Sequence, residues 1–268
     1  KDVCIDLLNN HVAELYYVIN NNRNLISLTE KKSILTKYSL LTNQQYNSDQ
    51  ELFKQKRTFR LLGPQPVTLN HQHLDPESPI NIIHGYAVTE KADGYRAMLF
   101  ITENRGYLIT SKLDVIYTGV KFPDVNGEWL FDGEYITKDK DKNDINLYMI
   151  FDVYYNGNRK DEKPSYNYVW HSKDDSMTRS KIIKDFEDKI RTMIINENSM
   201  EISFKNYQYG ALSDSEDDSL IFEKCKNILN TSSSYRYRID GLILMPVYTK
   251  VKGDKSGKDV KYIGGTWD

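Results

Sequence analysis

The sequence predicts an α+β fold, in which a helical N-terminal segment precedes a region of many short strands. Residues 1 to about 55 carry apolar side chains at three- and four-residue spacing, the period of an amphipathic helix: Ile5, Leu8, Val12, Leu15 and Ile19. After Pro64 and Pro66 the pattern changes to short β-rich runs separated by polar turns. Because strands far outnumber crossover helices there, we expect mixed α+β rather than a doubly wound sheet.

Two capping boxes predict further helix starts in the first segment. Ser27 precedes Glu30, and Ser48 precedes Glu51, each before a pair of apolar residues. The Asn-rich stretch at 20–24 ends the first helical pattern. We therefore assign residues 1–58 to a helical lead-in and residues 59–268 to the main domain.

Five runs predict strands in the main domain: YAVTEK, RAMLFI, GYLIT, EWLFDGEYI and NLYMIFDVYY. Thr178 is the predicted N-cap of a helix with one apolar face, formed by Ile182, Ile183, Phe186, Ile190 and Met193. EISFK at 201–205 predicts a strand, the acidic stretch at 213–219 a solvated loop, and 220–229 a short helix. The last clear strand is RIDGLILMPV at 238–247.

Composition excludes several classes of protein. No apolar run approaches the roughly 20 residues of a membrane helix, so no membrane partner is expected. Cys4 and Cys225 lie far apart, which favours a reduced, intracellular protein without structural zinc. The 36 basic residues nearly balance 38 acidic ones, so any nucleic-acid contact has to come from a local patch. Because the chain begins at Lys1 without a Met, we expect it to be a segment of a longer polypeptide or a processed product.

The first cluster that points to chemistry is EKADGYR at 90–96, between two predicted strands. The turn would present the Lys91 amine beside a carboxylate. A lysine amine is a nucleophile only when deprotonated, which at neutral pH requires a pKa below the reference value near 10.4. The alternative is an ordinary surface turn with a salt bridge.

Three further clusters place acids in apolar strands. They are FDGE at 131–134, Phe151-Asp152, and Asp240-Gly241. Buried acids are costly unless they bind something, such as a ribose hydroxyl or a divalent cation. Each cluster alone could be a turn or part of the core, but the set predicts a phosphate and metal site built on adjacent strands.

These four clusters, in this order, resemble motifs I, III, IIIa and IV of the covalent nucleotidyltransferase superfamily. That superfamily contains mRNA capping guanylyltransferases and ATP-dependent DNA and RNA ligases. The similarity covers roughly residues 60–250. The Asp-Gly opening of DGLILMP and the run GPQPVTLNHQHL followed by GYAVTEKADG look most like capping enzymes of large cytoplasmic DNA viruses.

The resemblance implies a nucleotidyltransferase domain with antiparallel sheets flanked by helices and a nucleotide cleft. It implies transfer of GMP from GTP, with Mg²⁺ or Mn²⁺, through a Lys91-GMP phosphoramidate to the 5′-diphosphate end of RNA. Flanking triphosphatase and methyltransferase domains and a cytoplasmic location, viral or in an infected host cell, are implied as well. The family's K-x-K-P motif V and its OB-fold domain are not evident; Lys250 and Lys252 imitate K-x-K, and Lys261 is equally eligible.

The resemblance also assigns roles to single residues. Lys91 would be the nucleophile, Arg96 and Glu134 would contact the ribose, and Phe151 would stack on guanine. Further nucleotide contacts are expected from Glu90, from Arg179 at the phosphates or the RNA end, from Lys205 at the guanine edge, and from Lys250 and Lys252 at the α-phosphate. Asp240 and Glu134 would serve the metal, whereas Asp93 and Asp132 would hold turns and neighbouring cations.

Two other functions stay open on the sequence alone. One is an ATP-dependent RNA or DNA ligase, which shares the lysyl-nucleotide step but uses AMP. The other is a catalytically silent nucleotide- or RNA-binding module, because motif V is not evident.

Overall fold

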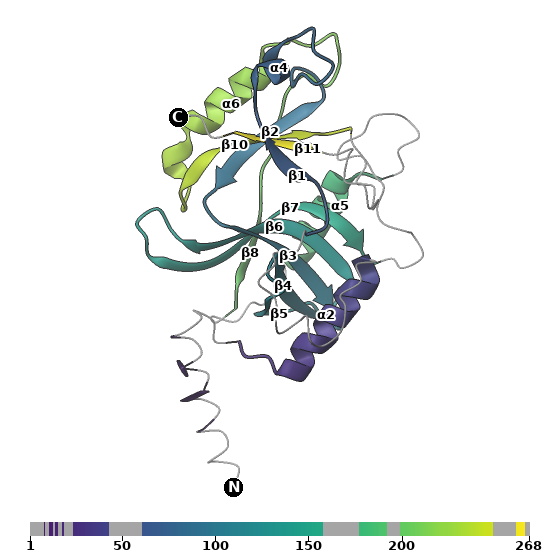
Figure 1. Ribbon diagram of the computed structural model, residues 1–268, viewed down its shortest axis with the longest axis vertical. Coiled ribbons are helices and arrows are strands. Elements are labelled where there is room, and N and C mark those ends of the chain that lie inside the picture. The colour runs from purple at the N-terminus through teal and green to yellow at the C-terminus, as the bar shows by residue number, and fades with distance from the viewer. Residues whose placement is uncertain are drawn as a thin grey trace.

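The computed structural model describes residues 24–42, 61–157, 177–191, 199–248 and 261–265, together with six separate helical positions between 8 and 18. For 261–265 it describes the backbone alone. Within these residues two β-sheets lie one above the other, with helices packed against them (Figure 1). The expected α+β class is confirmed.

The larger sheet has six strands in the order β5-β4-β3-β6-β7-β8. Its strands are β3 (Tyr95–Thr102), β4 (Arg105–Thr110), β5 (Val115–Lys121), β6 (Trp129–Lys138), β7 (Asp144–Asn156) and β8 (Glu201–Phe204). Neighbouring strands are antiparallel except β7 and β8, which are parallel.

The smaller sheet has five strands in the order β1-β11-β10-β2-β9. They are β1 (Gln65–Thr68), β2 (Tyr86–Ala92), β9 (Gln208–Tyr209), β10 (Ile239–Pro246) and β11 (Lys261–Gly265). The short helices α4 (His71–Leu74) and η1 (Ser232–Ser234) and the longer α6 (Leu220–Asn230) belong to this half. Apolar residues of α6, among them Ile221 and Ile228, pack with Val88, Leu242 and Leu244 of the sheet.

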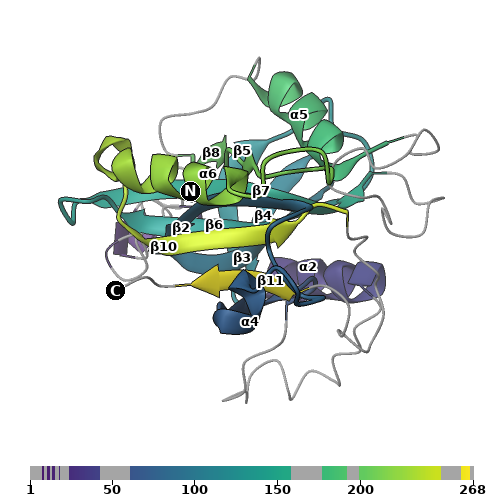
Figure 2. The ribbon, with the colours of Figure 1, turned by 90° about the horizontal axis from the view of Figure 1, so that it is seen from above.

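Strand β3 is buried on both faces, which explains its unbroken apolar run. Met98 and Phe100 pack in one cluster with side chains of α2 (Leu28–Thr42), whereas Leu99 and Ile101 pack in another with side chains of α5 (Arg179–Ile190). The two helices therefore cover opposite faces of the six-stranded sheet (Figure 2). The second cluster also includes Ala87 and Met245 of the smaller sheet, together with Val247 directly after β10, so it joins the two sheets.

Both predicted helix starts that fall on described residues are confirmed. The Glu30 N–H donates to Ser27 Oγ at 3.1 Å, and the Lys181 N–H donates to Thr178 Oγ1 at 3.2 Å. Helix α2 lies in the predicted lead-in, yet it packs on the large sheet. The predicted start at Ser48 and the boundary after residue 58 lie outside the described residues.

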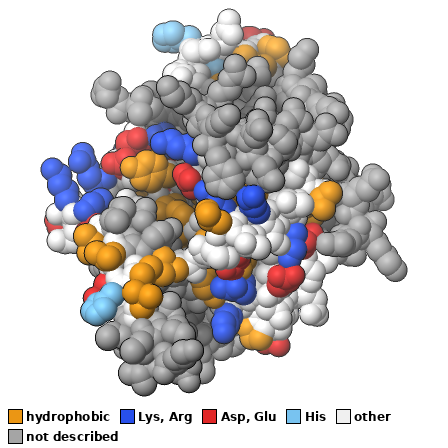
Figure 3. Space-filling view, turned by 60° about the horizontal axis from the view of Figure 1, so that its bottom comes forward, with side chains coloured by type: hydrophobic (Ala, Val, Ile, Leu, Met, Phe, Trp, Pro, Cys, Tyr) orange, Lys and Arg blue, Asp and Glu red, His pale blue; other side chains and the backbone are white. Residues whose placement is uncertain are grey.

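All the predicted strands and the helices at 178–193 and 220–229 are present within a few residues, apart from the part beyond 191 that is not described. The short elements β1, β5, β9, β11 and α4 had no separate prediction. No helix in the described part of the chain is long and apolar enough to cross a membrane. On the face shown in Figure 3, basic and acidic side chains are interspersed, in keeping with a formal net charge of -2.

Candidate active site

The Lys91 motif lies where the chain passes from the small sheet to the large one. Strand β2 ends at Ala92 and β3 begins at Tyr95, and these strands belong to different sheets. The Asp93 N–H donates to the Arg238 carbonyl at 2.9 Å, which ties the turn to the segment before β10. A Cβ on Gly94 would lie 2.8 Å from Glu134 Cγ, so glycine permits the close approach of this turn to β6.

A β-bulge in β10 brings the second acidic motif to Lys91. Ile239 pairs with Ala92 and Leu242 with Glu90, so two residues, Asp240 and Gly241, lie opposite the single Lys91. Gly241 has φ 149°, a conformation that favours glycine. The bulge places both carboxylate oxygens of Asp240 at 2.7 Å from Lys91 Nζ.

This ion pair remains open to solvent, since the Lys91 side chain is 33% exposed and that of Asp240 is 44% exposed. A reactive amine must reach its substrate, and this pair is accessible where the buried pairs described below are not. The structure thus brings together two predicted site residues that lie 149 positions apart in the sequence.

Glu134 is the second carboxylate of the site, on β6 directly opposite Arg96 of β3. Burial raises the pKa of its carboxyl group, and the charge of Asp132 raises it further. The positive charges of Lys205, Lys91 and Arg96 act in the opposite direction. Three predicted cationic residues therefore lie close enough to Glu134 to influence its ionisation.

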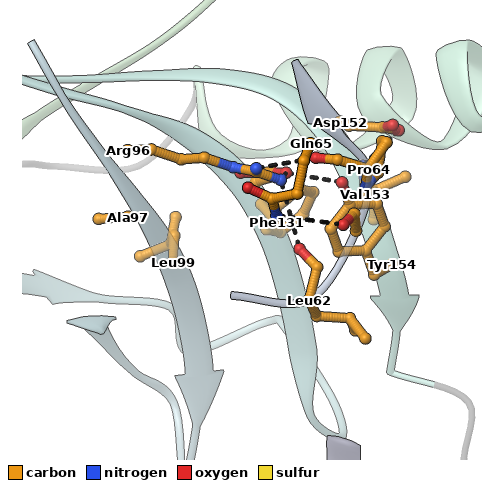
Figure 4. A network of polar contacts seen from close by, with 12 residues as sticks. Leu62, Pro64, Gln65, Arg96, Ala97, Leu99, Phe131, Asp152, Val153 and Tyr154 are labelled. Atoms are coloured by element: carbon orange, nitrogen blue, oxygen red, sulfur yellow. Dashed lines mark hydrogen bonds and ion pairs between the residues drawn. The ribbon is translucent and has the colours of Figure 1, made fainter. Parts of the chain in front are cut away.

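Arg96 is held by a polar network that links the six-stranded sheet to the chain entering β1 (Figure 4). Its Nε and Nη2 donate to the two carboxylate oxygens of Asp132, at 3.0 and 2.5 Å. Nη1 donates to the Pro64 carbonyl at 2.8 Å, and Nη2 also to the Leu62 carbonyl at 3.3 Å. The Tyr154 hydroxyl donates to Asp132 at 2.6 Å. The fully buried Asp132 thus orients Arg96, and the ribose contact of Arg96 stays a prediction.

Glu90, predicted as a nucleotide contact, is buried in this structure, and its contact with a nucleotide stays a prediction. Adjacent residues of a strand point to opposite faces, so Glu90 points away from the face of Lys91 and is 2% exposed. Its carboxylate accepts hydrogen bonds from the hydroxyls of Thr89, at 2.7 Å, and Tyr237, at 2.8 Å. These contacts make Glu90 a buried structural acid.

Lys205 and Phe151 do lie together, as the predicted base site requires. Lys205 Nζ is 6.0 Å from the centroid of the Phe151 ring. The same ammonium donates to the Glu90 carbonyl at 2.8 Å and lies 3.7 Å from its carboxylate. Both side chains are largely buried, and their contact with a base stays a prediction.

Arg179, predicted to contact phosphates or the RNA end, pairs with a buried carboxylate, and its contact with a ligand stays a prediction. Its Nε donates to Asp152 Oδ1 at 2.7 Å and its Nη2 to Oδ2 at 3.2 Å, with both side chains at most 1% exposed. Asp152 pairs with Asp132 across β6 and β7. Two carboxylates so placed would repel each other, and each has its own arginine, which offsets that repulsion.

Three predicted lysines cannot be placed in the site, and two tyrosines of the site had no prediction. Lys250 and Lys252 lie outside the described residues, and Lys261 begins β11 with its side chain outside them. Tyr154 and Tyr237, which hold Asp132 and Glu90, had no prediction. The chain has 20 tyrosines, and no local pattern distinguishes these two from ordinary core aromatics.

The described residues alone do not form a site for a divalent cation, so such an ion would also need ligands from the substrate. No group of three or more His, Cys, Asp or Glu residues there could hold a metal ion. Mg²⁺ is often bound by one or two carboxylates together with substrate phosphates. Asp240 and Glu134 fit that pattern and do not form an all-protein cage.

Comparison with known proteins gives a match to a protein family over most of the chain. Residues 29–262 match the family described as "mRNA capping enzyme, catalytic domain". A probable mRNA-capping enzyme of Acanthamoeba polyphaga mimivirus is 29% identical over 152 residues, which cover 56% of this chain and 11% of that protein.

Two solved ligase structures are weakly similar. A mycobacterial DNA ligase D complexed with ATP and MES gives a TM-score of 0.44 at 13% identity, covering 77% of this chain and 61% of that one. A structure from a study of Lig E DNA ligases gives 0.42 at 13% identity, covering 77% and 70%.

Proposed function

The chain belongs to the family of mRNA capping enzyme catalytic domains, and from that membership we propose that it carries GMP on Lys91 and passes it to an RNA end. Membership and the mimivirus relative confirm the resemblance expected from the motifs. The chain is accordingly a nucleotidyltransferase of mRNA capping. The use of GTP, the lysine intermediate and the residue roles form the proposal.

The contact between Lys91 and Asp240 is the observation that carries it. The Lys91 amine attacks the α-phosphorus of GTP, an N–P bond forms, and the bond to the β-phosphate oxygen breaks as pyrophosphate leaves. The amine must lose protons in this step, and the Asp240 carboxylate at 2.7 Å from Nζ is placed to accept one. No other carboxylate among the described contacts lies as close to Nζ.

The second step regenerates the amine. A terminal oxygen of the 5′-diphosphate RNA attacks the phosphorus, the N–P bond breaks, and Lys91 takes a proton back. Arg96, directly opposite Glu134, would hold the ribose of the nucleotide in place during both steps. A divalent cation bound by Asp240, Glu134 and the phosphates would offset negative charge.

Base selection follows from the pair formed by Phe151 and Lys205. An aromatic ring stacks on either purine, so it does not select a base. Lysine only donates hydrogen bonds, and therefore favours the carbonyl at position six of guanine over the amino group of adenine. We assign guanine recognition to Lys205 on this ground.

The wider context also belongs to the proposal. The matched segment spans 11% of the length of the mimivirus relative, which leaves ample room for other domains in that protein. Triphosphatase and methyltransferase neighbours, the RNA acceptor and a cytoplasmic location stay predictions for this chain.

Covalent labelling tests the proposal directly. The chain is incubated with α-labelled GTP or ATP and a divalent cation, and then run on a denaturing gel. Acid-labile label from GTP that pyrophosphate removes is the expected result, lost in Lys91→Ala and in Lys91→Arg but kept in Lys112→Ala, an exposed lysine in the β4–β5 turn. Label from ATP in preference to GTP would indicate a ligase, and equal label in Lys91→Ala would remove the nucleophile assignment.

A further inference from the structure

Five exposed basic side chains lie on two neighbouring segments beside the candidate site. Three belong to the β6–β7 hairpin and two precede β10: Lys138, Lys140, Lys142, Arg236 and Arg238, together called the hairpin surface. The Lys140 N–H donates to the Arg236 carbonyl at 3.0 Å, and Lys140 Nζ donates to the Ser233 carbonyl at 3.2 Å. The hairpin and the start of β10 are neighbours in both ribbon views (Figures 1 and 2).

This surface is continuous with the Lys91 turn. The Arg238 carbonyl accepts the Asp93 N–H at 2.9 Å, and the next residue, Ile239, pairs with Ala92. Arg238 therefore lies between the nucleophile's turn and the hairpin. Lys and Arg side chains gather at the left edge in Figure 3, the side on which the hairpin projects in Figure 1.

Four nearby acids, Asp139, Asp141, Asp144 and Glu201, offset most but not all of these five positive charges. Lys138 pairs with Asp144 at 2.8 Å and Arg236 with Glu201 at 2.8 Å. Asp139 is folded into the turn, where it accepts the side-chain amide of Asn143 at 2.9 Å, a hydrogen bond that lowers the pKa of its carboxyl group.

Lys140, Lys142 and Arg238 have no carboxylate partner among the contacts of the described residues. Bulk charge does not create this feature, because the whole chain has a formal charge of -2. A local group of exposed cations without ion-pair partners, next to a site for phosphates, is the pattern expected of a phosphate-backbone contact. Tyr95, directly after the Lys91 turn and 66% exposed, adds an aromatic side chain, which favours a nucleic acid over an acidic protein.

We propose that the hairpin surface binds the phosphate backbone of the acceptor RNA next to its 5′ end, with Lys140, Lys142 and Arg238 as the main contacts. This inference rests on the proposed function, in which the RNA end must reach the phosphorus held at Lys91. A strand that leaves Lys91 past Arg238 meets the hairpin next. The contacts are to phosphates, so they carry no sequence preference.

The test separates RNA binding from the first chemical step. The variant Lys140→Ala/Lys142→Ala/Arg238→Ala is compared with the parent chain and with Lys112→Ala/Lys121→Ala/Lys226→Ala, which removes the same charge from exposed positions elsewhere. The dissociation constant of a 5′-diphosphate single-stranded RNA is measured by fluorescence anisotropy at several salt concentrations. Lys91 labelling by GTP is measured in parallel.

We expect the hairpin variant to bind RNA about tenfold or more weakly and its salt slope to fall by about 2, at about 0.7 for each lost phosphate contact. Labelling by GTP should match the parent, and the control variant should bind RNA more tightly than the hairpin variant. Equal RNA affinity in the hairpin variant and the control would overturn the inference, whether or not the protein takes label from GTP. Absence of label in the parent together with selective loss of RNA binding would instead reject the proposed chemistry and keep the RNA surface.

Discussion

Lys91 Nζ lies at 2.7 Å from both carboxylate oxygens of Asp240, across a bulge that sets two residues of β10 against one of β2. We expect Asp240→Asn to reduce GTP labelling by about 10²-fold or more, the usual effect of losing a positioned proton acceptor. The pair is exposed, so the free energy of unfolding should change by no more than about 1 kcal/mol. Labelling kinetics and urea unfolding check the two effects, and parental labelling would exclude Asp240 from the chemistry.

Glu134 makes the stability of the chain depend on pH. Because burial raises the pKa of its carboxyl group in the folded state, the folded chain binds more protons than the unfolded chain above the ordinary value of 4.5. Its contribution to stability is complete below that pH and is lost as pH rises through the folded pKa.

Glu134→Gln keeps the shape of the side chain and removes this titration. As pH rises from 4.5 to 7.5, we expect the melting temperature of the variant minus that of the parent to increase. GTP labelling of the variant should be weaker than that of the parent. Glu223→Gln, at an exposed position of α6, should follow the parent at every pH. A difference in melting temperature between Glu134→Gln and the parent that does not change with pH over this range would contradict the assigned effect of burial.

Arg179 is expected to matter for stability, since it pairs with the buried Asp152. Arg179→Met leaves that carboxylate without its guanidinium and should lower the free energy of unfolding by about 3–5 kcal/mol. Arg191→Met removes a pair with Glu187 from the exposed end of α5, and should cost far less. Denaturant unfolding of the two variants decides the matter: similar small losses would mean that the pair with Asp152 does not stabilise the fold.

Lys205 provides the test of base choice. Lys205→Met removes the ammonium but keeps an unbranched side chain, and should shrink the preference for GTP over ATP. It should also cost about 1–3 kcal/mol of stability, because Glu90 loses a partner. Tyr237→Phe removes another partner of Glu90 and should cost a similar amount while it keeps the preference. Full discrimination by Lys205→Met would mean that another group reads guanine.

The local sequence pattern was sufficient to predict most helices and strands and to select the candidate site residues. Strand runs, Ser27 and Thr178 as caps, and the order of the acid and glycine motifs are properties of neighbouring residues, so they can be read along the chain. The short strands β1 and β9 escaped prediction, since four and two residues are too few to show a period.

The sequence by itself determined the α+β class, the Lys91 turn and the set of acids from which the site is built. The tertiary structure alone decided which of these acids meets the lysine. Asp240 reaches Lys91 through a bulge formed by strands 149 residues apart, while Glu90, its nearest acidic neighbour in sequence, is buried against Tyr237. The physical reason is that strand alternation and pairing register, which depend on long-range contacts, set the direction of each side chain.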